Sequence, residues 1–364
     1  MLNRIFITGG AGFIGSRLAR ALSPSVEQIT VFDNLHTQVH GEHASSPDFP
    51  ENVEFFLGDV ADGAHLNASV MKADPDTIFH LAAETGTGQS YDEPARYNSV
   101  NVMGTAHVIE AVRSLSRQDK PRRIVLAGSR AVYGEGAYLK DDKSVIVGPV
   151  RSAANLSAGV YAPVLSDGQK LRPCPTQEWL SHETASVYAS TKLQQEYLLT
   201  QCAAEGDYEP ALLRIQNVYG PGQSLKNPYT GVLSIFSSQI LAGQTLNIYE
   251  DGNIVRDFVY VDDVVSALIA AGRSQKAYPD PINIGSGYPA TILEAAKILL
   301  NALGAKDDGF EITGQFRPGD IRHAVADIDR ARTLLNWAPE VSLETGLTEL
   351  ATWARQSYEA KGYV

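Results

Sequence analysis

The chain has 364 residues, 44% of them hydrophobic and 20% charged, and a formal net charge of -12. This length and apolar content exclude a mainly disordered chain and favour one large or two coupled globular domains. The negative charge argues against nonspecific binding to nucleic acid or anionic membrane, so an anionic ligand must be held by a few placed positive groups. No apolar segment near the N-terminus is long enough for a signal peptide or a membrane span, and we expect a cytoplasmic protein.

Short β-branched runs alternate with helix-length stretches in the first half of the chain. The expected strands and helices are residues 4–8, 28–32, 53–57, 77–80 and 123–127, and residues 14–22 and 102–114, respectively. This alternation predicts an α/β fold with a Rossmann-type doubly wound parallel sheet and helices on both faces.

Three glycines, Gly9, Gly12 and Gly15, lie at a spacing of three between the first expected strand and the first expected helix. This pattern is typical of a turn that cradles a pyrophosphate. The first glycine permits a tight turn, the second lets backbone amides approach the phosphates, and the third packs the helix on the strand. Phe13 and Ile14, which open the helix, are expected beside the same cofactor.

Asp33 ends the second expected strand, 18 residues beyond Gly15, where a carboxylate binds the ribose 2'-hydroxyl of a dinucleotide. A carboxylate there also repels the 2'-phosphate of NADP, so the sequence predicts NAD as the cofactor. The alternative is a solvated turn residue followed by Asn34, which is itself expected at the cofactor. Asp59, next to Val60, is expected to accept a hydrogen bond from the adenine amine unless it belongs to an ordinary turn.

Residues 136–181 are rich in glycine, serine, proline and charge, with little periodicity outside the apolar run 145–150. We expect an insertion loop with one hairpin. Beyond it we expect a helix at residues 185–203, strands at 210–214, 257–261 and 281–284, and a helix from residue 291. This predicts an NAD-binding domain, residues 1–205, that contains the insertion. Residues 206–364 then form a smaller, mixed substrate-binding region, with some segments returning to the first domain.

Tyr188 and Lys192 are four residues apart in the helix expected at 185–203, so both side chains lie on one face. With the lysine ammonium and the positive nicotinamide nearby, we expect the phenol pKa to fall below its usual value of about 10, so that Tyr188 acts as a base. Taken alone, the pair also fits the exposed face of an ordinary amphipathic helix. Ser129, at the carboxyl end of the strand at 123–127, is expected to hydrogen-bond the reacting sugar oxygen.

Several motifs occur in a fixed order along the chain. They are GGAGFIG at 9–15, Asp33, His80 to Ala83, Asn101, Ser129, Val132 to Gly134, and Tyr188 with Lys192. In this order the chain resembles the extended short-chain dehydrogenases/reductases that modify sugar nucleotides, the NAD-dependent epimerase/dehydratase family, over nearly its whole length. The resemblance implies bound NAD, a nucleoside-diphosphate sugar as substrate, a role in polysaccharide biosynthesis, and a homodimer that pairs the helices near 102 and 185. It also implies cofactor contacts from Leu81, Ala82, Ala83 and Asn101.

The resemblance extends into the C-terminal third, where Asn217, Arg256 and Arg322 are expected to hold the substrate diphosphate. Isolated arginines that pair with phosphate oxygens would suit a net-acidic protein. Taken singly, each arginine could instead form a surface salt bridge. The residues expected around the sugar are Thr85, Gly86, Thr87, Gln89, Ser129 and Arg130, together with the insertion.

Residues 133–136 and 222–232 resemble enzymes described as dTDP-L-rhamnose 4-epimerases, and the chain is also similar to UDP-galactose 4-epimerases. Relatives of the first kind often carry paired Cys-x-x-Cys motifs in the insertion, whereas the insertion here has only Cys174. With Cys202 as the only other cysteine, the chain cannot form a disulfide framework or supply four cysteines to a structural zinc ion. We therefore expect inert thiols and no metal.

The residues after Ser129 distinguish the reactions of this family. Related dehydratases place an acid pair there to expel water, and decarboxylating relatives use a glutamate, but this chain has Arg130 and Ala131. Removal and return of one hydrogen at C4 needs no such acid, so the sequence favours a 4-epimerase acting through a 4-keto sugar, with a dTDP-6-deoxyhexose as candidate substrate. The alternatives are a net oxidoreductase (a 4-ketosugar reductase or a dehydrogenase), a 4,6-dehydratase, and a noncatalytic NAD-sensing or scaffold protein.

Overall fold

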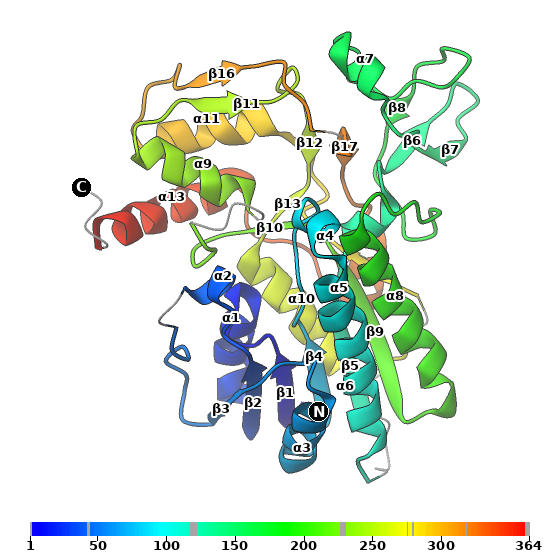
Figure 1. Cartoon of the computed structure of the whole chain (residues 1–364), viewed down its shortest axis with the longest axis vertical. Helices are drawn as coiled ribbons and strands as arrows, with labels where there is room; N and C mark the ends of the chain where they lie inside the picture. The colour runs from blue at the N-terminus through cyan, green and yellow to red at the C-terminus, as the bar shows by residue number, and fades with distance from the viewer. Residues whose placement is uncertain are drawn as a thin grey trace.

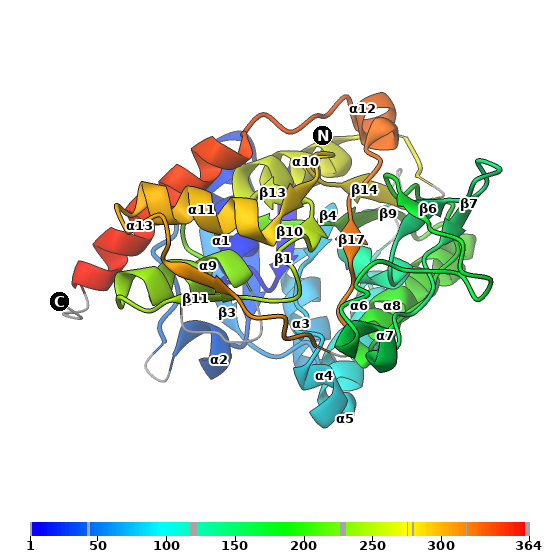
Figure 2. The same ribbon diagram turned by 90° about the horizontal axis from the view of Figure 1, so that it is seen from above.

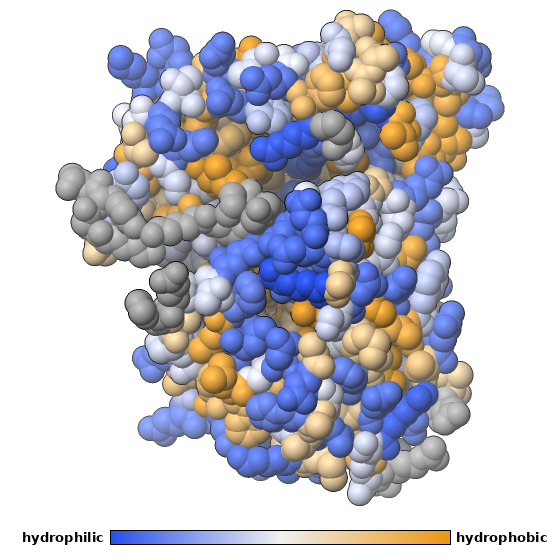
Figure 3. All heavy atoms as spheres, viewed as in Figure 1, coloured by the Kyte–Doolittle hydropathy of each residue, from blue (hydrophilic) through white to orange (hydrophobic). Residues whose placement is uncertain are grey.

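The computed structural model describes residues 2–41, 44–116, 122–225, 231–274, 276–278, 280–317 and 319–360. Figure 1 shows a lower lobe built on a large sheet and an upper lobe of smaller sheets and helices. On the face seen in Figure 3, hydrophilic side chains gather at the middle of the molecule, between the two lobes. Of the segment 222–232, which carries part of the finer resemblance, residues 226–230 lie outside the described residues.

Seven parallel strands form the large sheet, in the order β14-β9-β5-β4-β1-β2-β3. They are β1 (Arg4–Thr8), β2 (Gln28–Asp33), β3 (Val53–Leu57), β4 (Thr77–His80), β5 (Arg122–Ser129), β9 (Tyr208–Ile215) and β14 (Ile282–Ile284). The strand order reverses between β1 and β4, as in doubly wound folds, so the predicted fold class is confirmed. Ligands of such folds bind at the carboxyl ends of the strands, where Asp33 and Ser129 lie.

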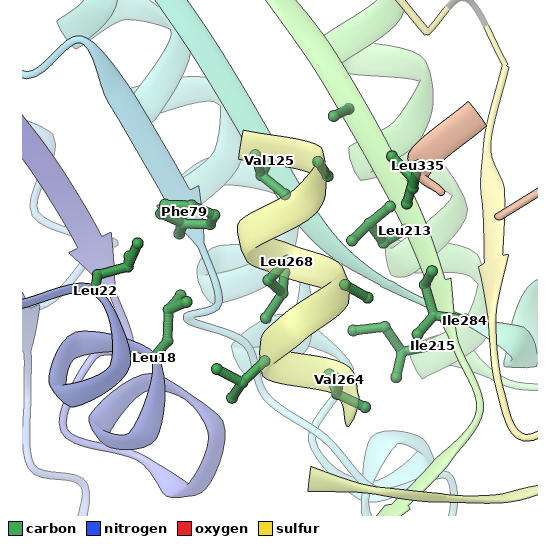
Figure 4. Close-up of a cluster of buried hydrophobic side chains, with 14 of the residues drawn as sticks. Leu18, Leu22, Phe79, Val125, Leu213, Ile215, Val264, Leu268, Ile284 and Leu335 are labelled. Carbon is green, nitrogen blue, oxygen red and sulfur yellow. The ribbon is translucent and has the colours of Figure 1, made fainter. Parts of the chain in front are cut away.

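Alternate residues of each strand point to opposite faces of the sheet, and helices cover both faces. Ile5 and Ile7 of β1 belong to the buried cluster of Figure 4, whereas Phe6 belongs to the cluster on the other face. The first face is covered by α1 (Phe13–Leu22), α10 (Val261–Arg273) and α12 (Asp329–Leu335). The second is covered by α3 (Gly63–Ala73), α6 (Gly104–Arg113) and α8 (Val187–Cys202). Burial of apolar side chains on both faces therefore stabilises the sheet that positions the site.

Short helical segments connect these elements. They are η1 (Ser23–Ser25), α2 (Thr37–His40), α4 (Gln89–Asp92), α5 (Pro94–Tyr97), the π-helical η2 (Asn98–Met103), η3 (Arg130–Tyr133) and η4 (Ala203–Glu205). The helix predicted at 102–114 is thus α6 preceded by a π-helical segment. Such segments occur frequently at functional sites, and this one contains Asn101.

The upper lobe packs small sheets and helices around a third buried cluster. Its strands are β10 (Asn217–Tyr219), β11 (Leu246–Ile248), β12 (Val255–Arg256), β13 (Phe258–Tyr260), β15 (Ala290–Thr291), β16 (Phe310–Ile312) and β17 (His323–Ala324). Its helices are α9 (Val232–Leu241), α11 (Ile292–Ala302) and α13 (Leu343–Ala360). Four elements from the same half of the sequence, β9, β14, α10 and α12, pack in the lower lobe instead.

The insertion forms a small antiparallel sheet at the opposite end of the molecule from α13, as Figure 2 shows. It contains β6 (Ala137–Leu139), β7 (Val145–Val147), α7 (Ala153–Ser157) and β8 (Arg172–Pro173). The predicted hairpin is β6 with β7, but β8 also pairs with β6, and α7 was not expected. The prediction of one hairpin was therefore incomplete, because β8 is only two residues long and has no periodicity to detect.

Candidate active site

The glycine turn between β1 and α1 has little room for side chains. Gly9 has a φ of +67°, and a Cβ there would lie 2.6 Å from the backbone nitrogen of Ala82. A Cβ on Gly15 would lie 2.4 Å from the carbonyl oxygen of Gly9, so this residue packs α1 on the turn. Gly12 is the N-cap residue of α1, whose first turn carries no acidic residue. These residues fit a dinucleotide, because the turn presents a helix N-terminus to the pyrophosphate without a competing carboxylate.

A pocket extends from this turn past the ends of the strands. Among the residues predicted at the cofactor, those that line it are Gly9, Gly12, Asp33, Asn34, Asp59, Val60, Leu81, Ala82 and Ala83. Phe13 and Ile14 instead pack their side chains against the upper-lobe cluster. The pocket is also lined by His36, Gln38, Val39 and His40 from α2 and its N-cap, which the sequence analysis missed. No signal marked them, because a helix of four residues is too short to show a periodicity.

Asp33 is 8% exposed, so it is not the solvated turn residue of the alternative interpretation. Its Oδ2 accepts a hydrogen bond from the backbone nitrogen of Ala11 at 3.0 Å, and its Oδ1 accepts one from that of Leu35 at 2.8 Å. Next to it, Asn34 Nδ2 donates to Asp59 Oδ2 at 2.9 Å. The carboxylate therefore fixes the glycine turn and borders the pocket, while contact with a ribose stays a prediction.

Asn101 links the pocket to α8. Its Oδ1 accepts from the backbone nitrogen of Glu84 at 2.8 Å, and its Nδ2 donates to Thr191 Oγ1 at 2.9 Å. His80 lies behind it, within hydrogen-bond distance of the hydroxyls of Thr8, at 2.7 Å, and Thr105, at 2.9 Å. Burial, followed by the charge of Lys192, lowers the pKa of His80 to about 3, so this imidazole is a neutral structural link.

Tyr188, Lys192 and Ser129 meet at the carboxyl end of β5. Helix α8 begins at Val187, where the side chain of Ser186 caps it by accepting from the backbone nitrogen of Ala189. The Ser129 hydroxyl lies near enough to Tyr188 to lower the pKa of the phenol, and Lys192 Nζ donates to the carbonyl oxygen of Ala127 at 3.0 Å. The lysine side chain is buried, which rules out the exposed-helix interpretation of the pair.

The expected lowering of the tyrosine pKa is wrong for the protein groups taken alone. Burial raises the pKa of Tyr188, and the Ser129 hydroxyl and the positive charge of Arg130 oppose that rise only in part. Burial also lowers the pKa of Lys192 to about 8, against the negative charge of Glu196. The groups that favour the phenolate are thus Ser129 and Arg130 rather than Lys192, whose ammonium donates to a backbone carbonyl.

A buried ion pair between Arg214 and Glu196 lies next to the Ser129, Tyr188 and Lys192 cluster. Arg214, on β9, binds both carboxylate oxygens of Glu196, one turn beyond Lys192 on α8. Its Nη1 also donates to the hydroxyl of Tyr133 at 2.8 Å, and Tyr133 ends the η3 segment that follows Ser129. Arg214 therefore holds α8, which carries Tyr188, and η3, which follows Ser129, against strand β9.

The residues expected around the sugar lie at the same end of the sheet. The hydroxyl of Tyr97 donates to the carbonyl oxygens of Thr85 and Gly86, and the hydroxyl of Ser90 donates to that of Thr87, so this loop is held from inside. Arg130 Nη2 donates to the carbonyl oxygen of Gly134 at 2.7 Å. Gln89 Nε2 donates to Glu93 Oε1 at 2.9 Å.

The expectation of isolated arginines is wrong. Arg256 Nη2 binds Asp320 Oδ1 at 2.6 Å, and Arg322 binds both oxygens of Asp251, at 2.7 and 2.8 Å. Asn217 lies on β10 beside this region, where its backbone nitrogen donates to the carbonyl oxygen of Asp257. In a net-acidic chain, carboxylates are available to pair with partly buried arginines, and the diphosphate role of these arginines stays a prediction.

The sequence model of the NAD dependent epimerase/dehydratase family matches residues 5–285. The chain belongs to this family. The match spans the glycine turn, the Ser129, Tyr188 and Lys192 cluster and the strands of the large sheet. The predicted family and an NAD-dependent enzyme are therefore confirmed, and NAD is the cofactor whose binding surface the turn provides.

Relatives in the epimerase/dehydratase family match the chain over nearly its whole length. The dTDP-L-rhamnose 4-epimerase of Burkholderia thailandensis is 38% identical, covering 98% of this chain and 96% of that protein. The UDP-glucose 4-epimerase of Mycolicibacterium smegmatis is 31% identical, covering 97% and 98%. The UDP-N-acetylglucosamine 4-epimerase structure from Methanobrevibacter ruminantium M1 has a TM-score of 0.78 at 28% identity, covering 98% and 100%.

Within the described ranges, no helix combines the length and apolar character needed to cross a membrane. The same part of the chain contains no group of three or more histidine, cysteine, aspartate or glutamate side chains arranged to hold a metal ion.

Proposed function

We propose that the chain is an isomerase, an NAD-dependent 4-epimerase of nucleoside-diphosphate sugars. The observation that carries the proposal is the cluster of Ser129, Tyr188 and Lys192 followed by Arg130 and Ala131. The cluster supplies a base for a sugar hydroxyl, whereas the two residues directly after Ser129, Arg130 and Ala131, offer no carboxylic acid to protonate a leaving hydroxyl. This favours epimerisation over dehydration.

The residues of the cluster have separate tasks in this reaction. Tyr188 takes the proton of the sugar 4-hydroxyl, and Ser129 hydrogen-bonds the same oxygen. Lys192, fixed on the carbonyl of Ala127, keeps a positive charge on the face of α8 that carries Tyr188. When bound, NAD supplies the acceptor and then the donor for the hydrogen at C4. The keto sugar must rotate between loss and return of the hydrogen at C4. The diphosphate therefore needs its own binding residues, so that it stays bound while the sugar ring rotates, and Asn217, Arg256 and Arg322 are the candidates.

We propose a dTDP-6-deoxyhexose as the substrate. Support comes from the 38% identity with a dTDP-L-rhamnose 4-epimerase over nearly the whole of both chains. The sugar would lie between Arg130 and the loop of Thr85, Gly86 and Thr87. A net oxidoreductase remains the second candidate, because it would use the same cluster but release its dinucleotide at each turnover.

The test is a panel of nucleoside-diphosphate hexoses, including dTDP-L-rhamnose, incubated with the purified enzyme and followed by NMR. The proposal expects a C4 epimer to accumulate to equilibrium without added dinucleotide. A steady change in NADH absorbance that continues with substrate consumption would instead identify the net oxidoreductase.

We also propose that the chain forms a homodimer through the outer surface of the helices near residues 102 and 185, which are η2 with α6 and α8. Support comes from large apolar side chains exposed there, Met103 on η2 at 50% and Tyr197 on α8 at 47%. Light scattering should give about twice the chain mass of 39.3 kDa, and a monomer at working concentration would contradict the proposal.

A further inference from the structure

Arg151 lies in the insertion, and its buried side chain contacts residues of the upper lobe. The side chain of Arg151 is 2% exposed, although the preceding residue, Val150, is 83% exposed. Its Nη1 donates to Glu250 Oε1 at 2.7 Å, and its Nη2 donates to the carbonyl oxygen of Asp320 at 2.6 Å. Burying a guanidinium is costly unless its charge is paired, so these contacts hold the insertion on the upper lobe.

Glu250 is shared between two arginines. It is 1% exposed, and while Oε1 accepts from Arg151, Oε2 accepts from Arg322 Nη1 at 2.8 Å. Arg322 also binds Asp251, which is 39% exposed. Arg322 therefore has one buried carboxylate partner, already engaged on its other oxygen, and one partner open to solvent.

One further contact joins the insertion to the arginine region, through Tyr161, which lies in the insertion together with Arg151. The carbonyl oxygen of Tyr161 accepts from Arg151 Nη1 at 3.1 Å, and the guanidinium carbon of Arg322 lies 5.8 Å from the centre of the Tyr161 ring. Asp320, whose carbonyl oxygen Arg151 binds, also holds Arg256 through its carboxylate. Arg151 is thus one residue removed from both arginines expected at the diphosphate.

We propose that Arg151 is a positioning residue for the substrate diphosphate: it occupies one oxygen of Glu250 and so leaves Arg322 available to phosphate oxygens. The proposal rests on the proposed function in one respect, the assignment of Arg322 to the diphosphate. An arriving diphosphate displaces the exposed Asp251, while Glu250 stays fixed by Arg151. Without Arg151, the buried carboxylate of Glu250 has Arg322 as its remaining arginine partner and binds it more tightly.

The two carboxylate partners of Arg322 lead to effects of opposite sign. Arg151→Met should weaken diphosphate binding, because Glu250 then competes more strongly for Arg322. Asp251→Asn should strengthen it, because the competitor that must be displaced loses its charge. If carboxylates did not compete with the diphosphate for Arg322, Asp251→Asn would leave binding unchanged.

The experiment is isothermal titration of the full-length, NAD-loaded enzyme with dTDP and with UDP. We expect Arg151→Met to raise the dissociation constant by about tenfold or more and Asp251→Asn to lower it, with bound NAD unchanged in both. Arg172→Met, a substitution of an exposed arginine on β8 of the same insertion, is the matched control and should behave as wild type. Arg322→Met should lose most of the affinity.

The outcomes separate the inference from the function on which it rests. If Arg322→Met binds dTDP and UDP as well as wild type, the diphosphate role of Arg322 fails and the inference fails with it. If Arg322→Met loses affinity while folded Arg151→Met matches Arg172→Met, only the inference is overturned. Should Arg151→Met not fold, Asp251→Asn decides, since unchanged or weaker binding contradicts the proposed competition.

Discussion

At the cofactor end of the site, the binding surface consists largely of backbone: a glycine turn, a helix N-terminus and a carboxylate held by two backbone amides. At the end proposed for the diphosphate it consists of long charged side chains that are already paired with carboxylates. A binding surface made of backbone keeps the same hydrogen bonds within the protein whether or not the ligand is bound. Under the proposed function, the paired arginines exchange carboxylate partners for phosphate oxygens each time the substrate binds, whereas the surface proposed for the cofactor keeps its hydrogen bonds throughout.

Substitution of Tyr188, which lies between the two ends of the site, should cause the largest loss of turnover. Tyr188→Phe removes the base without creating a cavity, so turnover should fall by a factor of about one hundred or more, with NAD content and diphosphate affinity retained. Tyr197→Phe, on the exposed side of the same helix, is the matched control. Turnover close to wild type in Tyr188→Phe would remove this residue from its role.

Gly9→Ala tests the cofactor end. The added methyl would lie 2.6 Å from the backbone nitrogen of Ala82, so we expect loss of bound NAD and a lower melting temperature. Gly243→Ala is the control, because Gly243 has a similar φ of +69° but nothing within 4 Å of the added atom. Equal losses in the two variants would mean that the backbone conformation, and not the contact with Ala82, decides the effect.

Asp33→Asn sharpens the account of cofactor choice. The amide keeps an oxygen for the backbone donor of Ala11 but loses the charge that repels a 2'-phosphate, so the preference for NAD over NADP should fall by about tenfold. The ratio of the two dissociation constants measures it. An unchanged ratio would restrict Asp33 to holding the turn.

The smallest expected effect is a shift in pH dependence. Burial lowers the pKa of Lys192 to about 8, so the ammonium loses its proton as the pH rises through this value, and turnover should decline on the alkaline side. Glu196 carries a negative charge that raises this pKa. Glu196→Gln should therefore move the alkaline decline to lower pH in folded enzyme, and a decline at the wild-type position would show that it belongs to another group.

The same contrast between the two ends explains what the sequence could reveal. The glycine turn, Asp33 and the Tyr188 and Lys192 pair are readable because each depends on short spacings within one strand, turn or helix. Strand β14 was expected at residues 281–284 but helix α10 was not expected, and both join the lower lobe through apolar burial.

The pairing of the arginines could not be read in this way. Arg151 and Glu250 are 99 residues apart, and Arg322 and Glu250 are 72 apart. Nothing local to these residues marks their partners, so the sequence predicted isolated arginines where the structure has a shared carboxylate. The direction of the Tyr188 pKa was missed for a related reason, since burial is a property of the assembled fold.

The most direct test of the 4-epimerase account is to follow the hydrogen at C4 during turnover in deuterium oxide. If C4 is inverted through a keto sugar held in the site, the hydrogen leaves to NAD and returns from it without meeting solvent. NMR should then show an epimer with protium at C4 and no deuterium at C3 or C5. Deuterium at C5, as expected of dehydration, or at C3, as expected of an enol intermediate, would contradict the account.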